Sequence, residues 1–370
     1  METVRRAVKQ IAYTPPSQWL STLSAFHLSL TPFIYLASSL YSVAVRLRHH
    51  LYRFNILHQQ RLPVPVISVG NLTWGGNGKT PMVEFLARSF ADYGISPLIL
   101  TRGCGGADEA KMLERQLQGT SAKIGVGANR VATAATFLER YGYVIFGGVF
   151  DKFLSEKTNS DRIGAAILDD GMQHLSLWRD LEIVMVNALM PWGNHQLLPL
   201  GALREPLTAL SRADILVVHH ADLVPEKDID ALELTVRIAK KSIPIFFTKM
   251  APIHFFPCRD VSCKMPLRVV ENMIVLCLSG IGFADSFVQR VERDIEMVQT
   301  RLQALESEFA AKPIVVVTEK DYDRAPEVLE RLEHYEVLVL CCRLQFLVHK
   351  GSTEDGFKKI VREYLSQRLG

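Results

Sequence analysis

The segment that most restricts the fold of this chain is an apolar run that leads into a glycine-rich turn. Residues 64–70 read VPVISVG, and residues 73–80 read TWGGNGKT. The β-branched run predicts a buried strand, and the sequence after the turn is suited to a helix. Glycines in such a turn let backbone N–H groups point at phosphate oxygens, and the helix N-terminus adds its positive end. The segment therefore predicts a strand–turn–helix unit that binds phosphate.

The order of residues in the turn indicates a nucleotide-binding P-loop. The pattern G-x-x-x-x-G-K-[ST] is matched at its end, whereas a threonine stands where the first glycine is usual. In this motif the lysine reaches the β- and γ-phosphates and the following hydroxyl binds Mg²⁺. A chance glycine-rich turn is the alternative, and the strand before it and the helix after it argue against that. The expected nucleotide-binding residues are Thr73, Trp74, Gly75, Gly76, Asn77, Gly78, Lys79 and Thr80.

Two adjacent carboxylates meet the second requirement of such a site. The apolar residues 165–168 end in Asp169 and Asp170. Two neighbouring acids at the end of a buried strand are costly unless a cation neutralises them, and P-loop enzymes hold Mg²⁺ with such a carboxylate. A solvated turn is the weaker alternative, because the polar sequence GMQH follows. We expect Thr80, Asp169 and Asp170 to take part in a magnesium site.

The N-terminal sixty residues differ from the rest of the chain in charge and hydropathy. No acidic residue lies between Glu2 and Glu84, although several arginines do, and residues 10–45 carry no Lys, Arg, Asp or Glu. A basic leader without acids is attracted to anionic lipid and also fits an organellar import sequence. Residues 26–45 are long and apolar enough to cross a bilayer, but Pro32 and several hydroxyl side chains favour an interfacial helix. A core helix pair that packs on the next domain is the alternative.

The overall composition is that of a globular protein. Hydrophobic residues make up 48% and charged residues 22% of the 370 residues, and the mean hydropathy of +0.11 is compatible with membrane contact. A net charge of +3 is too small to indicate a nucleic-acid partner. The six cysteines show neither a secreted disulfide framework nor zinc-site spacing, so we expect buried thiols.

Short β-branched runs alternate with helical stretches, which indicates a parallel α/β sheet. Strands are expected at 64–69, 97–101, 123–126, 164–168, 182–186, 215–219, 273–279, 313–317 and 337–341, and helices at 78–93, 129–141, 226–241, 294–309 and 354–367. Residues 242–267, rich in Pro and aromatic side chains, look like a connection between two α/β units. We expect a leader with a membrane-contacting helix in 1–60, a P-loop domain in 61–241 and a smaller second α/β domain in 242–370.

Further motifs, taken with the P-loop, resemble one family. In order, the chain reads VPVISVGNLTWGGNGKTP, TRGCGG, ADEA, VGANR, LDDGMQH, RDLEIV, WGNHQLLPLGALREP, SGIG and TEKD. This series is similar to that of the tetraacyldisaccharide 4′-kinases of lipid A biosynthesis, in particular their plant, organelle-targeted branch. The resemblance implies a kinase that uses ATP and Mg²⁺ to phosphorylate the 4′-hydroxyl of tetraacyldisaccharide 1-phosphate, giving lipid IVA. It also implies action at a membrane surface, and with the basic leader it suggests a mitochondrial location.

The resemblance assigns roles to residues that spacing alone does not explain. Asp108, in ADEA, stands at the position of the family's catalytic acid. Arg130 and Arg204 match basic residues expected to touch phosphate, and Arg204 would neutralise charge on the transferred group. Glu205 matches a metal-site acid, alongside the two strand-end aspartates. His174, which ends the LDDGMQH motif, is expected near the substrate.

One family segment is missing from this chain. The family carries a D-H-H segment between its SGIG and TEKD motifs, and the histidine is thought to pair with the catalytic aspartate. Here no histidine occurs between His254 and His334. A general base contributes roughly 10²–10⁴-fold to a rate, so we expect Asp108 to act alone and turnover to be slowed. The alternative is that His254, His219 or His220 fills the place in space.

Two other functions remain open from the sequence. A family member without catalysis could bind nucleotide or glycolipid, because phosphoryl transfer depends on positioning the nucleophile. A P-loop GTPase-type switch could use TEKD at 318–321 to read a base, although the apolar leader argues against this.

Overall fold

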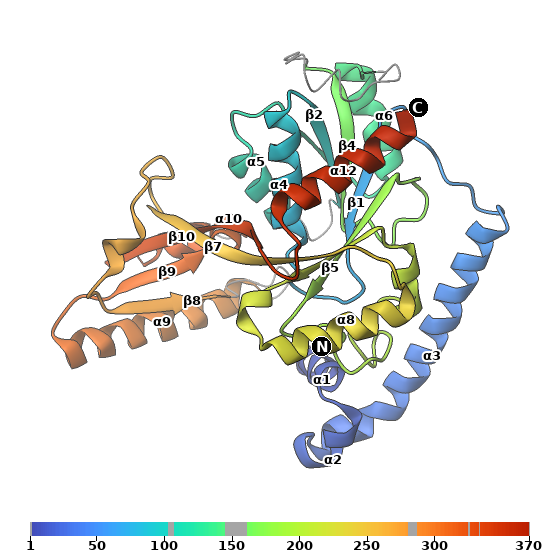
Figure 1. The fold of residues 1–370 in the computed structure, drawn as a ribbon. Coiled ribbons are helices and arrows are strands. Elements are labelled where there is room, and N and C mark those ends of the chain that lie inside the picture. Colours follow the sequence, from blue (N-terminus) through green and yellow to red (C-terminus); the bar gives the residue numbers. More distant parts are fainter. Residues whose placement is uncertain are drawn as a thin grey trace. The chain divides into compact units, whose positions relative to one another are not determined.

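The computed structural model describes residues 2–102, 107–144, 161–279, 287–324, 326–332 and 334–369. They form two compact units, shown with their elements in Figure 1. Unit 1 comprises Met1–Thr101, Thr120–Lys249 and Phe346–Gly370, and unit 2 comprises Arg102–Gly119 and Met250–Gln345. Each unit is therefore assembled from segments that are separated in the sequence.

Unit 1 is built on a parallel sheet with the P-loop strand near its centre. In spatial order its strands are β3 (Lys123–Val126), β2 (Ser96–Thr101), β4 (Ile163–Asp169), β1 (Val66–Gly70), β5 (Leu181–Asn187), β6 (Ile215–His219) and the start of β7 (Ile245–Pro257). Each strand pairs in parallel with its neighbours. The chain leaves β1 in one direction for β2 and later returns on the other side for β5. In α/β proteins ligands bind where the strand order reverses in this way, beyond the carboxyl ends of the strands.

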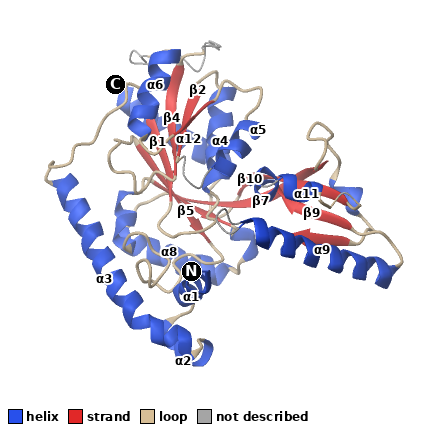
Figure 2. Cartoon of the chain, turned by 180° about the vertical axis from the view of Figure 1, so that it is seen from behind, coloured by secondary structure: helices blue, strands red, loops and turns tan. Residues whose placement is uncertain are grey.

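Helices cover both faces of this sheet, as Figures 1 and 2 show. Buried side chains of α6 (Arg130–Tyr141) pack on β1, β2 and β4, and those of α8 (Glu226–Ala239) pack on β5 and β6. Paired residues of parallel strands point to the same face, so the register places α6 and α8 on one face. The helix α4 (Lys79–Asp92) packs on β1, β2 and β4, and Phe85 of α4 lies against Phe357 of α12 (Glu354–Leu369).

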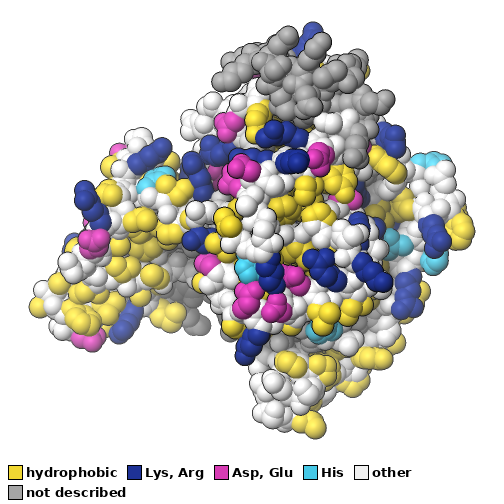
Figure 3. Space-filling view, in the orientation of Figure 1, with side chains coloured by type: hydrophobic (Ala, Val, Ile, Leu, Met, Phe, Trp, Pro, Cys, Tyr) yellow, Lys and Arg dark blue, Asp and Glu magenta, His cyan; other side chains and the backbone are white. Residues whose placement is uncertain are grey.

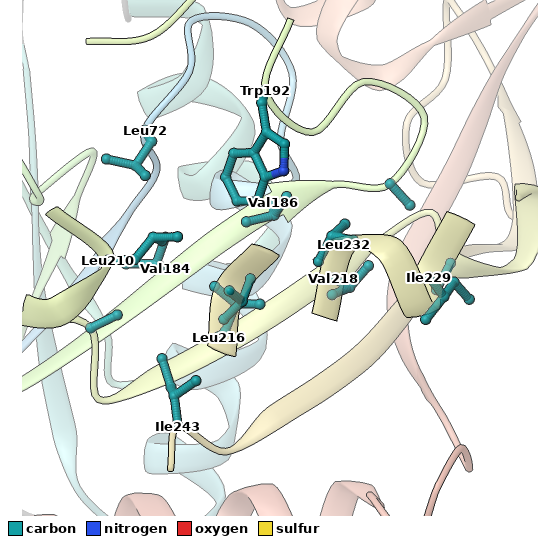
Figure 4. Close-up of a cluster of buried hydrophobic side chains, with 14 of the residues drawn as sticks. Leu72, Val184, Val186, Trp192, Leu210, Leu216, Val218, Ile229, Leu232 and Ile243 are labelled. Carbon is teal, nitrogen blue, oxygen red and sulfur yellow. The ribbon is translucent and has the colours of Figure 1, made fainter. Parts of the chain in front are cut away.

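A hydrophobic cluster supports the loops beside β5. Leu72, which precedes the P-loop, points with Trp192 and Val186 into the same group of buried side chains (Figure 4). Burial of each large side chain stabilises the fold by roughly 1.5–3 kcal/mol. It therefore holds the two loop segments against the sheet beside β5. The site loops are therefore anchored by core packing as well as by hydrogen bonds.

The N-terminal segments belong to unit 1. They form α1 (Glu2–Tyr13), the short helices η1 (Pro16–Gln18) and α2 (Trp19–Thr22), and the long helix α3 (Ala25–Arg53). Figures 1 and 2 show α3 along the outer margin of this unit. By length and composition α3 could cross a membrane, and 17% of its most apolar window is buried.

Unit 2 has its own smaller sheet and core. The strands β10 (Glu336–Leu347), β9 (Ile314–Thr318) and β8 (Val275–Leu278) pair in parallel, and β7 lies beside β10. The helices are α5 (Ala107–Gln116), α9 (Phe287–Phe309), α10 (Glu319–Arg324) and α11 (Pro326–Glu330). Short 3₁₀ turns occur across the two units at η2 (Leu207–Arg212), η3 (Ala221–Leu223) and η4 (Leu267–Val270).

The expected parallel α/β architecture is confirmed, and each expected strand and helix is present, although α9 begins well before residue 294 and β10 continues well beyond residue 341. One element and the domain boundaries also differ from expectation. The presumed connection 242–267 contains the strand β7. Its Pro252 and its aromatic residues favoured a loop in the sequence, because proline is rare inside strands. The units also do not follow the expected sequential boundaries, because β10 leads the chain back and α12 joins unit 1.

Candidate active site

The P-loop turn has a fixed shape that its own side chains maintain. Gly78 and Gly75 adopt φ values of +75° and +106°, which suit glycine and strain other residues. The Asn77 amide donates to the backbone oxygens of Thr73 and Gly75, at 3.3 and 3.2 Å. With Gly78 as N-cap of α4, the turn presents backbone N–H groups at a helix N-terminus, which is the arrangement that binds phosphate.

A neighbouring loop braces this turn from outside. Residue 73 forms an isolated antiparallel bridge with residue 203. The N–H of Trp74 donates to the Ala202 oxygen at 3.0 Å, and that of Arg204 donates to the Leu72 oxygen at 2.6 Å. The segment that carries Arg204 is therefore tied to the P-loop by main-chain hydrogen bonds.

Three cationic side chains meet at Asp170, which follows β4. Arg204 Nη1 lies 2.7 and 2.8 Å from the two carboxylate oxygens of Asp170, and Lys79 Nζ lies 3.5 Å from one of them. Arg130 Nη1 donates to the Asp170 backbone oxygen at 3.1 Å. Burial alone would raise the pKa of Asp170, but Lys79, Arg204 and Arg130 hold it below its usual value. The site therefore holds more positive than negative charge, as a polyphosphate requires.

Other polar residues orient these groups. Lys79 Nζ also donates to Asn71 Oδ1 at 3.1 Å, and Gln173 Nε2 donates to the Asn71 oxygen at 3.0 Å. Asp169 is buried, and Thr101 Oγ1 lies 3.4 Å from its Oδ2. His174, half-buried, has its Nε2 3.1 Å from Ser176 Oγ.

Comparisons with known proteins show the family of the chain. The family model described as tetraacyldisaccharide-1-P 4′-kinase matches residues 30–109 and 106–363. The chain belongs to the tetraacyldisaccharide 4′-kinase family. A relative from Arabidopsis thaliana, named a probable mitochondrial tetraacyldisaccharide 4′-kinase, is 48% identical over 394 aligned positions that cover 100% of this chain and 99% of the relative. A tetraacyldisaccharide 4′-kinase from Syntrophus aciditrophicus is 37% identical over 69% of this chain and 70% of its own length.

A solved structure shares the fold of this tetraacyldisaccharide 4′-kinase family member. The LpxK protein of Aquifex aeolicus, crystallised with ATP, matches with a TM-score of 0.59 and 25% identity over 91% of this chain and 98% of its own. The family resemblance inferred from the motifs is thus confirmed, together with the fold class.

Most of the expected site residues of unit 1 lie together, but Glu205 has different surroundings from those expected. The P-loop, Asp169, Asp170, Arg130 and Arg204 form one cluster at the carboxyl edge of the sheet. The fully buried carboxylate of Glu205 instead lies 2.9 Å from His49 Nε2 and 2.8 Å from Arg212 Nη2. Among the described residues, no three His, Cys, Asp or Glu side chains gather into a ready metal site. The structure therefore gives Glu205 one cationic partner, Arg212, and one imidazole partner, His49, within the protein.

The sequence did not identify Asn71 and Gln173 as site residues. Asn71 follows β1 directly, and Gln173 lies inside the LDDGMQH motif, so their positions next to site residues were the available signal. These two residues connect Lys79 to Arg204 by hydrogen bonds. Lys79 bonds to Asn71, Gln173 bonds to Asn71, and Arg204 Nη1 lies 3.3 Å from Gln173 Oε1.

His219 is not available as a replacement base in this family member. Its ring is 1% exposed, lies behind Gly78, and has Nδ1 3.0 Å from Thr248 Oγ1. Burial, followed by the neighbouring His220, lowers the pKa of His219 to about 3, so the ring is neutral. A ring enclosed in this way supports the P-loop and does not reach a substrate hydroxyl.

His220, the other histidine candidate in unit 1, lies beside the His219 ring with 4.1 Å between ring centroids. The candidates Asp108 and His254 lie in unit 2. Asp108 belongs to α5, but its side chain lies outside the described residues. His254, on β7, is half-buried, and burial together with Lys264 lowers its pKa, so it too is a neutral imidazole at pH 7. The TEKD acids are buried and engaged: Glu319 pairs with Arg115 at 2.9 Å, and Asp321 accepts from Thr318 Oγ1 at 2.8 Å. TEKD therefore begins α10 and is not an open base-reading loop.

Proposed function

We propose that this chain is an ATP-dependent kinase that phosphorylates the 4′-hydroxyl of tetraacyldisaccharide 1-phosphate, the lipid A precursor. The observation that carries the proposal is the convergence of Lys79, Arg204 and Arg130 on Asp170 beside the P-loop turn. Cations held in place before the substrate arrives stabilise charge on a phosphoryl group in flight without further reorganisation. The name and bound nucleotide of the similar Aquifex protein support ATP as the phosphoryl donor.

The residues present fit a magnesium ion brought in with ATP. Thr80 and the acids Asp169 and Asp170 offer hard oxygen donors next to the P-loop, which is the chemistry that Mg²⁺ prefers. Because no three His, Cys, Asp or Glu side chains gather among the described residues, phosphate oxygens would supply further ligands. When bound, Mg²⁺ neutralises charge on the β- and γ-phosphates.

The chain's own groups then divide the work of transfer. The P-loop N–H groups and Lys79 hold the β- and γ-phosphates, and Arg204, held beside Asp170, stabilises the charge on the transferred phosphoryl group. We assign Asp108 to accept the proton of the 4′-hydroxyl as its oxygen bonds to the γ-phosphorus. The bond from that phosphorus to the β–γ bridging oxygen breaks, and ADP leaves. Arg130 and His174 contribute to holding the glycolipid's polar part.

The substrate carries acyl chains, and α3 offers a surface for the membrane that contains it. One side of α3 exposes Phe33, Leu36, Leu40, Val43 and Leu47, each at least 57% exposed. In Figure 3 hydrophobic side chains reach the surface along the margin where Figure 1 places α3. We propose that α3 lies in the membrane interface. We also propose that the protein acts in mitochondria, because the plant relative is named a mitochondrial protein.

The test is transfer of ³²P from γ-labelled ATP to tetraacyldisaccharide 1-phosphate in detergent micelles, with Asp108→Ala as the matched variant. We expect labelled product from the natural chain and a loss of roughly 10²-fold or more in the variant. ATP binding, followed by thermal shift with Mg²⁺, should survive in Asp108→Ala. Absence of transfer by the natural chain would refute the kinase proposal.

One observation favours a second function, a nucleotide- or glycolipid-binding member without catalysis. No histidine lies between His254 and His334, where the family's base partner is expected. His254→Gln separates the two possibilities: a fall in transfer would indicate that His254 supplies the missing imidazole. ATP binding without any transfer by the natural chain would instead support the binding function.

A further inference from the structure

The helix α3 has a second face, opposite in character to its exposed apolar side. Ile34, Ser38 and Val45 are buried, and with Tyr41 and His49 they follow the three- and four-residue spacing of one helix face. We call Ser38, Tyr41 and His49 the inner polar residues of α3. Polar side chains on the packed side of a helix almost always have hydrogen-bond partners. These partners therefore show which segment the helix packs against.

All three inner polar residues contact the loop formed by residues 197–205. Ser38 Oγ donates to the Leu197 oxygen at 2.9 Å, and Tyr41 Oη donates to the Arg204 oxygen at 2.9 Å. His49 Nε2 lies 2.9 Å from Glu205 Oε2. The helix α3 therefore contacts both ends of the loop. At the C-terminal end of the loop it contacts Arg204 and Glu205.

The charge of Glu205 makes the last of these contacts more than a surface pair. Its side chain has no exposed area, and His49 and Arg212 share one carboxylate oxygen, at 2.9 and 2.8 Å. A buried carboxylate is tolerated when it is paired and hydrogen-bonded, and leaving it without a partner is costly. His49 therefore connects α3 to the side chain of Glu205, the residue that follows Arg204.

Arg204 is thereby held from three directions. Its N–H donates to Leu72 before the P-loop, its carbonyl accepts from Tyr41, and its guanidinium pairs with Asp170. A shift of the loop by about 1 Å would displace a guanidinium from the transferred phosphoryl group, and misplacement of that size can cost on the order of 10²-fold in rate.

We infer that the inner polar residues of α3 position Arg204 for phosphoryl transfer, so that the helix with the apolar outer face also sets the geometry of the active site. The inference rests on the proposed kinase function. Ser38, Tyr41 and His49 act through the loop and are positioning residues, whereas Arg204 is the group that meets phosphate. Glu205 takes part in the same arrangement, because its carboxylate is the group that His49 contacts.

The helix provides a matched control for each inner residue. Ser39, Tyr35 and His50 lie on the exposed side of α3; Tyr35 is 62% exposed, and Ser39 Oγ donates within the helix to the Tyr35 oxygen. His50 stacks on Phe54 of the same segment. The test set is therefore Ser38→Ala, Tyr41→Phe and His49→Gln against Ser39→Ala, Tyr35→Phe and His50→Gln.

The measurements are kcat, the KM for ATP and the melting temperature, in detergent micelles, together with sedimentation on vesicles that contain anionic lipid. Each inner variant should lower kcat about 5-fold or more, as expected for one lost hydrogen bond, while the KM for ATP and vesicle binding stay within about twofold. The outer variants should keep the natural kcat. Equal kcat in the inner and outer sets would overturn the inference. A loss of kcat that disappears when the assay is run well below the variant's melting temperature would also overturn it, because unfolding would then be its cause.

A double-mutant cycle tests the anchor directly. If Glu205 acts with His49, Glu205→Gln and His49→Gln combined should slow transfer no more than the worse single variant, and the Mg²⁺ concentration for half-maximal rate should not change. Additive losses with a raised Mg²⁺ requirement would make Glu205 a metal ligand and contradict the inference.

Hydrogen exchange of residues 197–205 gives a result that does not depend on catalysis. The amides of this loop should exchange at least about 10-fold faster in the inner variants than in the outer ones, because the loop opens locally. Unchanged exchange would overturn the inference. A natural chain without transfer activity refutes the proposed function, and in that case hydrogen exchange still decides whether α3 holds the loop.

Discussion

The imidazole of His219 lies so close behind Gly78 that a Cβ at residue 78 would come within 2.5 Å of its Cδ2 atom. Gly78 also has a φ of +75°. Gly78→Ala should therefore lower the free energy of unfolding by about 2 kcal/mol or more and abolish ATP binding. Gly76→Ala is the matched control for stability, because nothing lies within 4 Å of its added methyl group. Urea unfolding and ATP-dependent thermal shift check both, and equal stability of the two variants would contradict the packing argument.

The same histidine makes stability depend on pH in a defined direction. Burial lowers the pKa of His219 from 6.5 to about 3, so between these values the unfolded chain binds a proton that the folded chain does not. Stability should fall as the pH drops from 6.5 toward 3, by up to about 1.4 kcal/mol per pH unit from this group. His220, whose pKa burial also lowers, adds in the same direction. His219→Asn, measured by urea unfolding between pH 4 and 7, should show a shallower slope; an unchanged slope would exclude His219 as its source.

The sequence predicted the parts of the site that depend on local pattern. The P-loop and the paired acids at the end of β4 follow from a strand, a turn and the residues just after them. The parallel sheet then brings the carboxyl ends of β1 and β4 together without further information, because the two strands pair directly. Arg204 required the family resemblance, since its position depends on a loop far away in the sequence.

The features that the sequence did not predict depend on long-range contacts. The family resemblance matched Glu205 to a metal-site acid, and the contact of Glu205 with His49, which lies 156 residues earlier in the chain, was not predicted. β7 looked like a linker because Pro252 interrupts it, yet residues 245–248 pair with β6. Neither contact leaves a local signal, so composition and spacing could not reveal them.

Arg179 should prove essential for the turn that carries Asp170, although it touches no substrate. Its guanidinium donates to the backbone oxygens of Gly171, Met172 and His174 and pairs with the buried Glu182. Arg179→Met leaves Glu182 without its cation and should cost about 3–5 kcal/mol in the free energy of unfolding.

Two further variants separate charge from shape at this position. Arg179→Met combined with Glu182→Gln should recover most of the lost stability, because no charge is then left buried alone. Arg179→Lys keeps the charge but lacks the planar fork, so it should weaken ATP binding more than its effect on unfolding explains. Calorimetric ATP binding and urea unfolding provide the comparison. No recovery in the double variant would show that the carboxylate is not the source of the cost.

The basic leader should remain in the mature protein, because α1 supports the P-loop. Tyr13 Oη donates to the Trp74 oxygen at 3.2 Å, and Asn194 Nδ2 donates to the Ile11 oxygen at 3.1 Å, while Ile11 itself is fully buried. Deletion of residues 2–13 should lower the melting temperature and weaken ATP binding, since Ile11→Ala alone should cost about 2–5 kcal/mol. Lys9→Ala, exposed on the same helix, is the control and should change neither. Mass spectrometry of the protein isolated from its cells should find peptides that include Ile11 and Tyr13. A mature chain that begins after residue 13 and binds ATP as tightly as the full chain would show that α1 is dispensable.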